Sequence, residues 1–366
     1  MKILLFTPYI EESTEYNFSL AKELGTLVEL HVAFFKTEYP AYRRNCTVHY
    51  ISSSILPGKM KREWMELLKE IEPDVVHIED RGMYQSTLIQ KCTQQLGYKV
   101  VVSPQHMLNR GAGLRLLYQK RMLARADAIV INSKAEWAML SKREYKEKMT
   151  VIAHGVEMDR VKLKTDWERR KKILVINRMG TEDEMEMFID TVSLLKQELR
   201  EYRIAIIDEG SPLYSALFKE TVKEAGVEHL FDFYEEIDKE NKWRLYRESA
   251  LYVLLAGPGE ADHTVREALA SGTPVVATHE TSWEELETNH CGWWVEASTE
   301  AMAEAIKEYL QLSEKGLDIM GRNGRKLVEE KYSCSKVAGQ YLTLYSQMQG
   351  NIQPEKQQTK FSYIFN

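Results

Sequence analysis

The stretch of the chain that decides the fold spans residues 257–296 and reads GPGEADHTVREALASGTPVVATHETSWEELETNHCGWWVE. It begins in a loop, continues into a short helix that carries Glu267, turns at Ser-Gly-Thr-Pro and enters the apolar run PVVAT. A short apolar run rich in β-branched residues and bounded by turn residues is typical of a buried strand. A second helix and another strand follow, so the segment alternates as a parallel sheet covered by helices does.

The same alternation fills the rest of the chain in two blocks. In the first block we expect helices at 59–72, 84–96 and 114–125, and strands at 2–7, 27–35, 47–52, 74–79, 99–103, 127–132 and a last one near 150. The charged stretch 160–172 then interrupts the pattern as a linker would. In the second block we expect helices near 182–199, 212–225, 239–249, 263–271, 281–288, 299–312, 314–331 and 335–348, and strands at 172–177, 202–208, 230–234, 250–256, 273–278 and 292–296.

Two such blocks predict an α/β protein with two Rossmann-like, doubly wound domains that face each other across a cleft. The predicted domains are 1–160 and 161–334, with the helix at 335–350 packing back on the first domain and a polar tail at 351–366. A chain of 366 residues fits two domains of ordinary size. Ligands of doubly wound sheets bind at the carboxyl ends of the strands, so the cleft is the expected active site.

Composition narrows the class of protein further. The chain is 44% hydrophobic and 28% charged, which is ordinary for a globular protein. It has no apolar run of about 18 residues, and its start, MKILLFTPYIEE, is typical of a buried strand rather than a signal peptide. We therefore expect a cytoplasmic protein. The four cysteines are far apart and include no CxxC pair, which favours buried thiols over a zinc site or disulfides.

Charge is distributed unevenly along the chain. Residues 1–150 carry 22 Lys and Arg against 17 Asp and Glu, whereas the remainder carries 27 against 38. A basic first half suits an anionic acceptor or a membrane surface, while an acidic second half is unfavourable for phosphates. A sequence pI near 6.0 and the lack of a nucleic-acid motif argue against a nucleic-acid partner.

The helix that carries Glu267 has the features of a nucleotide site. Free backbone N–H groups and the positive end of the dipole at its start suit a diphosphate. Asp262, His263, Thr264 and Val265 occupy that start, and Glu267 follows about one turn later, where a carboxylate can accept hydrogen bonds from ribose hydroxyls. The alternative is that Glu267 only solvates a helix, and that His263 merely begins a helix capped by Asp262.

EALASGTPVVAT resembles the signature of family 4 glycosyltransferases, in which a glutamate precedes a small apolar helix and a Gly-x-Pro-Val-Val strand. Further agreement lies in SWEELETNHCGWWVE and in LSEKGLDIMGRNGRKLVEEKYS (312–333). The segments SPQHMLNR (103–110), RADAIVINSKAEWAML (125–140) and VIAHGVEMDR (151–160) resemble the acceptor domain of the same family and its connection to the donor domain. The resemblance covers nearly the whole chain and implies the glycosyltransferase B fold.

The resemblance also implies an activity. Members of the family transfer sugar from a nucleotide-sugar donor, with retention and without a metal ion, often to saccharide or lipid-linked acceptors in the synthesis of cell-surface polysaccharides and glycoconjugates. Glu267 would hold the ribose, while Arg178 and the amides of Thr264 and Val265 would stabilise the leaving diphosphate. The chain has no DxD sequence, which agrees with an expectation of no metal and no other cofactor.

Three positions depart from the family pattern. The first of the two family glutamates falls at Gly259, with Glu260 one residue later as its possible replacement. The lysine expected after Arg178 is replaced by the acidic run 182–184, and the glycine-rich loop after the first strand carries Glu11 and Glu12. These departures leave two hypotheses open, an active transferase with rearranged donor contacts or a degenerate member that acts as a binding or partner subunit.

The first block supplies the expected acceptor side. Gln105, His106 and Asn109 follow the strand 99–103, and His106 can hydrogen-bond a sugar hydroxyl or the developing phosphate charge, unless it only ties down its loop. The helix 114–126 is amphipathic and basic, so peripheral contact with the inner face of the membrane is one interpretation. A core-facing helix with a solvated basic face is the other.

Overall fold

The computed structural model of the chain describes residues 1–8, 15–35, 45–52, 57–80, 83–104, 114–141, 145–164, 171–177, 181–209, 212–234, 237–255 and 261–350. The chain divides into two compact units. Unit 1 contains Met1–Ile131, Ser141–Ile152 and the end of the chain from Val337, and unit 2 contains Asn132–Leu140 and Ala153–Lys336. The chain therefore passes between the units more than once.

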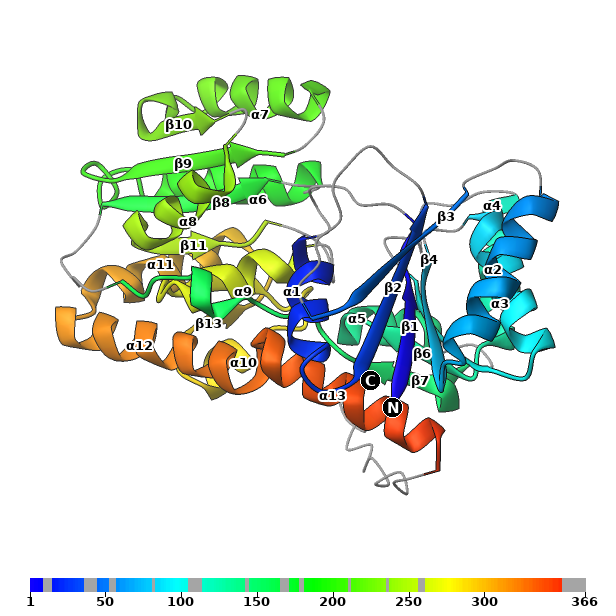
Figure 1. Cartoon of the computed structure of the whole chain (residues 1–366). Coiled ribbons are helices and arrows are strands. Elements are labelled where there is room, and N and C mark those ends of the chain that lie inside the picture. Colours follow the sequence, from blue (N-terminus) through cyan, green and yellow to red (C-terminus); the bar gives the residue numbers. More distant parts are fainter. Residues whose placement is uncertain are drawn as a thin grey trace. The chain divides into compact units, whose positions relative to one another are not determined.

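Unit 1 is built on a parallel sheet in the order β3-β2-β1-β4-β5-β6-β7 (Figure 1). Its strands are β1 (Lys2–Phe6), β2 (Glu29–Phe35), β3 (Thr47–Ile51), β4 (Val75–Asp80), β5 (Lys99–Pro104), β6 (Ala128–Ile131) and β7 (Met149–Val151). Its helices are α1 (Glu15–Leu24), α2 (Pro57–Ile71), α3 (Tyr84–Gln95), α4 (Leu114–Arg125) and α13 (Cys334–Met348), with a 3₁₀ turn at Lys146–Lys148. The strand order reverses between β1 and β4, as in a doubly wound sheet.

Unit 2 repeats the arrangement with the parallel order β10-β9-β8-β11-β12-β13 (Figure 1). Its strands are β8 (Lys172–Asn177), β9 (Arg203–Asp208), β10 (Phe231–Tyr234), β11 (Leu251–Val253), β12 (Val275–Thr278) and β13 (Gly292–Val295). Its helices are α5 (Lys134–Ser141), α6 (Glu182–Leu194), α7 (Pro212–Glu224), α8 (Lys239–Glu248), α9 (Asp262–Ala270), α10 (Glu285–Thr288), α11 (Thr299–Gln311) and α12 (Glu314–Leu327), with 3₁₀ turns at Met158–Arg160 and Glu228–Leu230 and a π-helical turn at Val328–Tyr332. The prediction of two Rossmann-like, doubly wound sheets is confirmed.

Alternation along the strands produces two cores in unit 2, one on each face of its sheet. Ile173 and Val175 of β8 pack against α6 and α11, whereas Leu174 and Ile176 pack on the other face against α8 and α9. Because both faces are apolar and covered, polar groups that serve a ligand are left to the ends of the strands.

Helix α13 packs on the core of unit 1 and is joined to its sheet by a buried polar contact. The imidazole of His77 on β4 is hydrogen-bonded to the Tyr345 hydroxyl of α13 at 2.7 Å and to the Ser103 hydroxyl of β5 at 2.7 Å. Burial lowers the pKa of His77 to about 3, so the ring stays neutral and both of its nitrogens can take part in neutral hydrogen bonds.

Several predicted elements are shorter in the structure, such as the helix expected at 182–199, which ends at Leu194. The strand expected at 250–256 is β11 with only three residues, Leu251–Val253. The helix expected at 281–288 begins only at Glu285, because the Thr281 amide and hydroxyl both donate to the carbonyl of Thr278 and form a tight turn after β12. Upstream, Gly272 has a φ of 81° in the Ser-Gly-Thr-Pro turn, a conformation that glycine adopts without strain.

Two helical glycines predict opposite effects of the same substitution. A Cβ at Gly324 of α12 would lie 2.9 Å from Cδ2 of Leu269 on α9, whereas a Cβ at Gly339 of α13 would meet nothing within 4 Å. We expect Gly324→Ala to destabilise the protein by about 1–3 kcal/mol through overpacking. Gly339→Ala should stabilise it by roughly 0.5–1 kcal/mol through helix propensity. Urea unfolding of both variants measures the difference, and equal effects would contradict the close packing of α12 on α9.

Candidate functional site

Helix α9 begins one residue earlier than it would if Asp262 were its N-cap. The N-cap is Ala261, which makes no side-chain capping bond, and Asp262 is the first helical residue. The Asp262 carboxylate is buried and accepts a hydrogen bond of 2.8 Å from the indole N–H of Trp283. The interpretation of Asp262 as N-cap is therefore wrong, because this side chain turns toward the indole instead of toward the first amides of the helix.

Thr264 and Val265 are largely used by the fold itself. The Thr264 amide donates to the carbonyl of Ala261 at 3.0 Å, and its hydroxyl is hydrogen-bonded to the Tyr252 hydroxyl at 2.7 Å. The Val265 side chain is fully buried in the core between α9 and the sheet. His263 is partly exposed at the same helix start. The predicted use of these backbone amides by a diphosphate stays a prediction.

Glu267 lies on the next turn of α9 and is held by two groups of α8. The Tyr246 hydroxyl donates to Oε2 of Glu267 at 2.9 Å, and the Lys242 ammonium lies 3.3 Å from the same oxygen. Burial and the nearby Glu267 charge raise the pKa of Tyr246 well above its usual range, so the phenol remains a hydrogen-bond donor. Charge-assisted bonds of this kind are stronger than neutral ones and fix the carboxylate in place.

A second carboxylate meets the same cation. Glu209 directly follows β9, and its Oε1 lies 3.7 Å from the Lys242 ammonium. The carboxyl end of β9, the first turn of α8 and the second turn of α9 therefore converge on Lys242. In an open α/β sheet this edge is where ligands bind.

A buried charge cluster lies on another side of α9. The Arg266 guanidinium is almost fully buried and lies over the rings of Trp283 and Tyr332, at 6.0 and 5.6 Å from their centroids. Glu136 of α5 belongs to the same cluster, and its carboxylate accepts a hydrogen bond of 2.7 Å from the Asn132 amide. Burial and, to a smaller extent, the charge of Asp262 raise the pKa of Glu136, while the hydrogen bond from the Asn132 amide and, more weakly, the charge of Arg266 oppose this rise.

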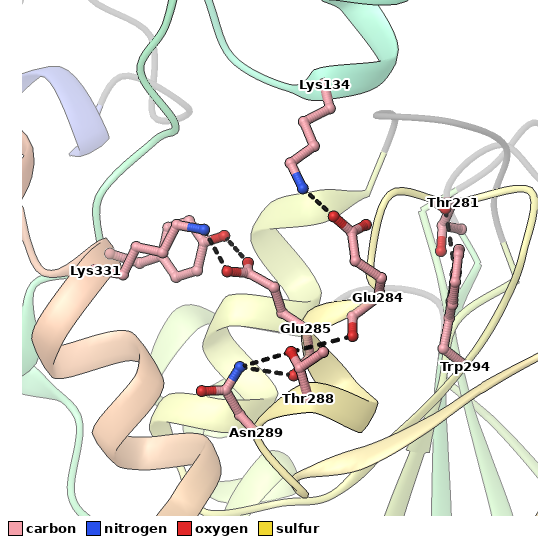
Figure 2. A network of polar contacts seen from close by, with 9 residues as sticks. Lys134, Thr281, Glu284, Glu285, Thr288, Asn289, Trp294 and Lys331 are labelled. Atoms are coloured by element: carbon pink, nitrogen blue, oxygen red, sulfur yellow. Dashed lines mark hydrogen bonds and ion pairs between the residues drawn. The ribbon is translucent and has the colours of Figure 1, made fainter. Parts of the chain in front are cut away.

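Further polar contacts connect α10 to its neighbours in unit 2. Figure 2 shows Glu284 paired with Lys134 of α5, and Glu285 paired with Lys331. Glu285 also accepts a hydrogen bond from the Tyr332 hydroxyl. The Trp294 indole N–H donates to the Thr281 carbonyl at 3.3 Å (Figure 2). These contacts fix the loop after β12 and the aromatic rings that enclose Arg266.

The start of α6 stands where the family pattern predicts a lysine. Thr181 caps the helix by accepting a hydrogen bond from the Glu184 amide, and the Glu184 side chain accepts one from the Thr181 amide at 2.7 Å. This capping box satisfies both amides within the chain. Glu182 and Asp183 add negative charge to the same turn, which is favourable for the helix dipole and unfavourable for a phosphate.

Five predicted site residues lie outside the described part of the chain: Arg178, Glu260, Gln105, His106 and Asn109. Glu11 and Glu12 also lie outside it. Among the described residues, no group of three or more His, Cys, Asp or Glu side chains is arranged to hold a metal ion. None of the described helices is long and apolar enough to cross a bilayer.

Family models match both halves of the chain. The model described as Glycosyl transferases group 1 matches residues 158–327, and the model described as Glycosyltransferase Family 4 matches residues 14–160. The chain belongs to glycosyltransferase family 4. It is thus a transferase by class, and the resemblance seen in residues 257–296 is confirmed.

Individual relatives agree with this assignment. Mannosylfructose-phosphate synthase of Agrobacterium fabrum is 31% identical over 114 residues, a match that spans 30% of this chain and only a quarter (25%) of the relative's own length. Sucrose-phosphate synthase from Thermosynechococcus elongatus has a TM-score of 0.71 at 16% identity, over 96% of this chain and 100% of that one. Anabaena HepE in complex with UDP and glucose has a TM-score of 0.73 at 14% identity, over 95% and 100%. The two structures show that the glycosyltransferase has the B-type fold.

The sequence did not single out Lys242, Tyr246 or Trp283 as site residues. Lys242 and Tyr246 are four residues apart and so share one face of α8, but this spacing does not reveal which helix they face. Their partner Glu267 lies more than twenty residues away along the chain. Only the packing of α8 on α9 brings them together.

The raised pKa of Glu136 predicts how this glycosyltransferase responds to pH. A carboxyl group with a folded pKa above its unfolded pKa binds more protons in the folded state, so it lowers stability as pH rises through that interval. We expect Glu136→Gln to be at least as stable as wild type at pH 7, with a gain on the order of 1 kcal/mol, because an amide can still accept the Asn132 bond without a buried charge. The gain should shrink toward pH 4.

The measurement is urea unfolding at pH 4, 5.5 and 7, with the exposed Glu147→Gln as the matched control. We expect the control to remain within about 0.5 kcal/mol of wild type at each pH. Destabilisation by Glu136→Gln that grows with pH would show that the charge is needed, and would contradict this account of the cluster.

Proposed function

We propose that the protein transfers a sugar, with retention, from a nucleotide-sugar donor to a saccharide or lipid-linked acceptor in the synthesis of a cell-surface polysaccharide or glycoconjugate. The observation that carries the proposal is the placement of Glu267 on α9, where Tyr246 and Lys242 orient its carboxylate at the ligand-binding edge of the unit 2 sheet. Family membership and the likeness to HepE, which was solved with UDP and glucose, support a nucleotide-sugar donor.

In the proposed mechanism the residues of unit 2 bind the donor. Glu267 accepts hydrogen bonds from the ribose hydroxyls. Arg178, His263 and the positive end of α9 stabilise charge as the diphosphate departs, without a metal ion. Glu260 contacts the donor sugar. Gln105, His106 and Asn109 position the acceptor, and His106 hydrogen-bonds a sugar hydroxyl close to the reacting carbon.

A second candidate function is favoured by the start of α6. The capping box of Thr181 and Glu184 leaves no cation at the described start of this helix, and its acidic first turn repels a diphosphate. A family member that binds a sugar or a partner subunit without turnover is consistent with this arrangement. The two functions differ in whether a nucleotide binds and reacts.

A nucleotide titration tests the proposed function. In thermal-shift measurements with UDP, GDP, ADP and CMP and their sugar conjugates, without added metal, we expect one nucleotide to raise the melting temperature of the wild type as its concentration exceeds Kd. Glu267→Gln should reduce that shift strongly, since hydrogen bonds to a charged group contribute about 1.5–3 kcal/mol. The exposed Glu304→Gln on α11 is the control.

A shift together with sugar transfer to an acceptor would establish the transferase. Binding without transfer would favour the second candidate, and no shift with any nucleotide would refute the donor site as a whole. If the nucleotide raises the melting temperature of Glu267→Gln as much as that of the wild type, Glu267 is not part of the nucleotide site. The assignment of the fold would not be affected.

We propose peripheral contact of α4 with the inner face of the membrane. Met122 and Leu123 face the core, while Leu117, Lys120, Arg121 and Arg125 are exposed on the opposite side of the helix. Lys and Arg near an anionic lipid surface each contribute about 1 kcal/mol to binding, and salt screens this attraction.

Liposome sedimentation measures this contact. We expect binding to vesicles with phosphatidylserine, weaker binding at 0.5 M salt, and an at least tenfold loss in a Lys120→Glu, Arg121→Glu double variant. A Lys61→Glu, Lys69→Glu double variant on α2 has the same change of charge and should bind as the wild type does. Equal binding to neutral and anionic vesicles would contradict a membrane role of α4.

A further inference from the structure

The Lys242 ammonium is shared by two carboxylates from different elements. It lies 3.3 Å from Oε2 of Glu267 on α9 and 3.7 Å from Oε1 of Glu209 at the end of β9. The lysine side chain is 17% exposed, so the ion pairs are partly shielded from water while one side of the cluster remains accessible. Without this cation, two like charges would stand close together at the ligand-binding edge, which is unfavourable.

The contacts of Glu267 are all on one oxygen. Both the Tyr246 hydroxyl and the Lys242 ammonium engage Oε2, and none of the described residues is hydrogen-bonded to Oε1. A carboxylate oxygen has lone pairs for about two hydrogen bonds, and the part of the chain that the structure describes leaves this acceptor capacity of Oε1 unused. The α8 groups thus occupy one oxygen and leave the other for a ligand.

Lys242 also retains the capacity to donate. An ammonium group has three N–H donors, and the two carboxylates that lie 3.3 and 3.7 Å from it use at most two of them. The site therefore presents an acceptor, Oε1 of Glu267, beside a donor, an N–H of Lys242. A ribose can place one of its adjacent hydroxyls on each group, whereas a 2′-deoxyribose has only its 3′-hydroxyl to share between the two.

We infer that Lys242 is a positioning and specificity residue of the donor site: it holds Glu267 in its ligand-binding orientation and, together with it, recognises the vicinal hydroxyls of a ribonucleoside diphosphate. This inference rests on the proposed function, and it assigns to Lys242 a role that the family resemblance alone does not. The role is separate from the stabilisation of the leaving diphosphate. Lys242 therefore affects the affinity for the donor, and the preference for ribose over 2′-deoxyribose, more than the rate of the chemical step.

The test uses isothermal titration of the full chain with the best-binding nucleotide among UDP, GDP and ADP, and with its 2′-deoxy counterpart. We expect the wild type to prefer the ribonucleotide by about tenfold or more, because the deoxy form leaves polar groups of the site unpaired. Lys242→Met should weaken ribonucleotide binding by about tenfold and deoxynucleotide binding less, so that the preference shrinks. Lys242→Arg, which retains the charge, should restore most of the preference.

Arg244→Met is the matched control on the same helix, because Arg244 is exposed and pairs with Glu248 instead of Glu267. It should leave affinity and discrimination unchanged. With a turnover assay, Lys242→Met should raise the donor KM and change kcat less. If Lys242 had a purely structural role, Lys242→Met would instead lower the melting temperature and weaken the binding of both nucleotides equally.

The outcomes separate this inference from the function on which it rests. A wild type that binds no nucleotide overturns the proposed function and the inference with it. A wild type that prefers the ribonucleotide, together with a Lys242→Met variant of unchanged preference, overturns only the role of Lys242. If Lys242→Met weakens the binding of both nucleotides equally, the proposed role of Lys242 is also overturned.

Discussion

Burial of both faces of a parallel sheet is the constraint on which the rest of the structure depends. In unit 2, successive residues of β8 enter two different apolar cores, and helices cover each of them. Neither face can accommodate polar ligand-binding groups without a large cost of burial. Polar groups gather instead where strands end and helices begin, which is why Glu209, Lys242 and Glu267 come together although they lie far apart in the sequence.

Helix α9 shows how this constraint assigns roles to neighbouring residues. Val265 packs in the core, Arg266 lies between two aromatic rings, and Glu267 faces Tyr246 and Lys242. Successive residues of an α-helix point about 100° apart, so three consecutive side chains reach three different environments. One turn of helix α9 therefore contributes to the core, to the aromatic pocket and to the candidate ligand site, so that a shift of this turn would affect all three.

Local patterns were sufficient to predict the fold but only part of the site. The strand 172–177 is β8 to the residue, because its apolar run ends at charged and turn residues on both sides. Glu267 could be singled out because it stands at a fixed distance from a turn and a helix start. Lys242 and Tyr246 could not, because their importance arises from the packing of α8 on α9. The same holds for Asp262, whose bond to Trp283 depends on a turn at Thr281 that helical periodicity does not encode.

In the proposed mechanism, the charges of unit 2 separate ribose recognition from stabilisation of the leaving group. Lys242 is engaged by Glu209 and Glu267, and the Arg266 guanidinium is enclosed by Trp283 and Tyr332, so neither of these described cations is placed to neutralise a diphosphate. The start of α6 adds negative charge instead.

In the proposed mechanism the charge of the diphosphate is neutralised by Arg178, His263 and the dipole of α9, which acts only over the first turn of the helix. In the same mechanism ribose recognition is supported by Tyr246 and Lys242 of α8, whereas the described start of α6 supplies no positive group for the departing diphosphate. In the proposed mechanism the chain binds its nucleotide through one set of residues and reacts through another, so we expect substitutions in α8 to alter affinity and substitutions at the phosphate end to alter rate.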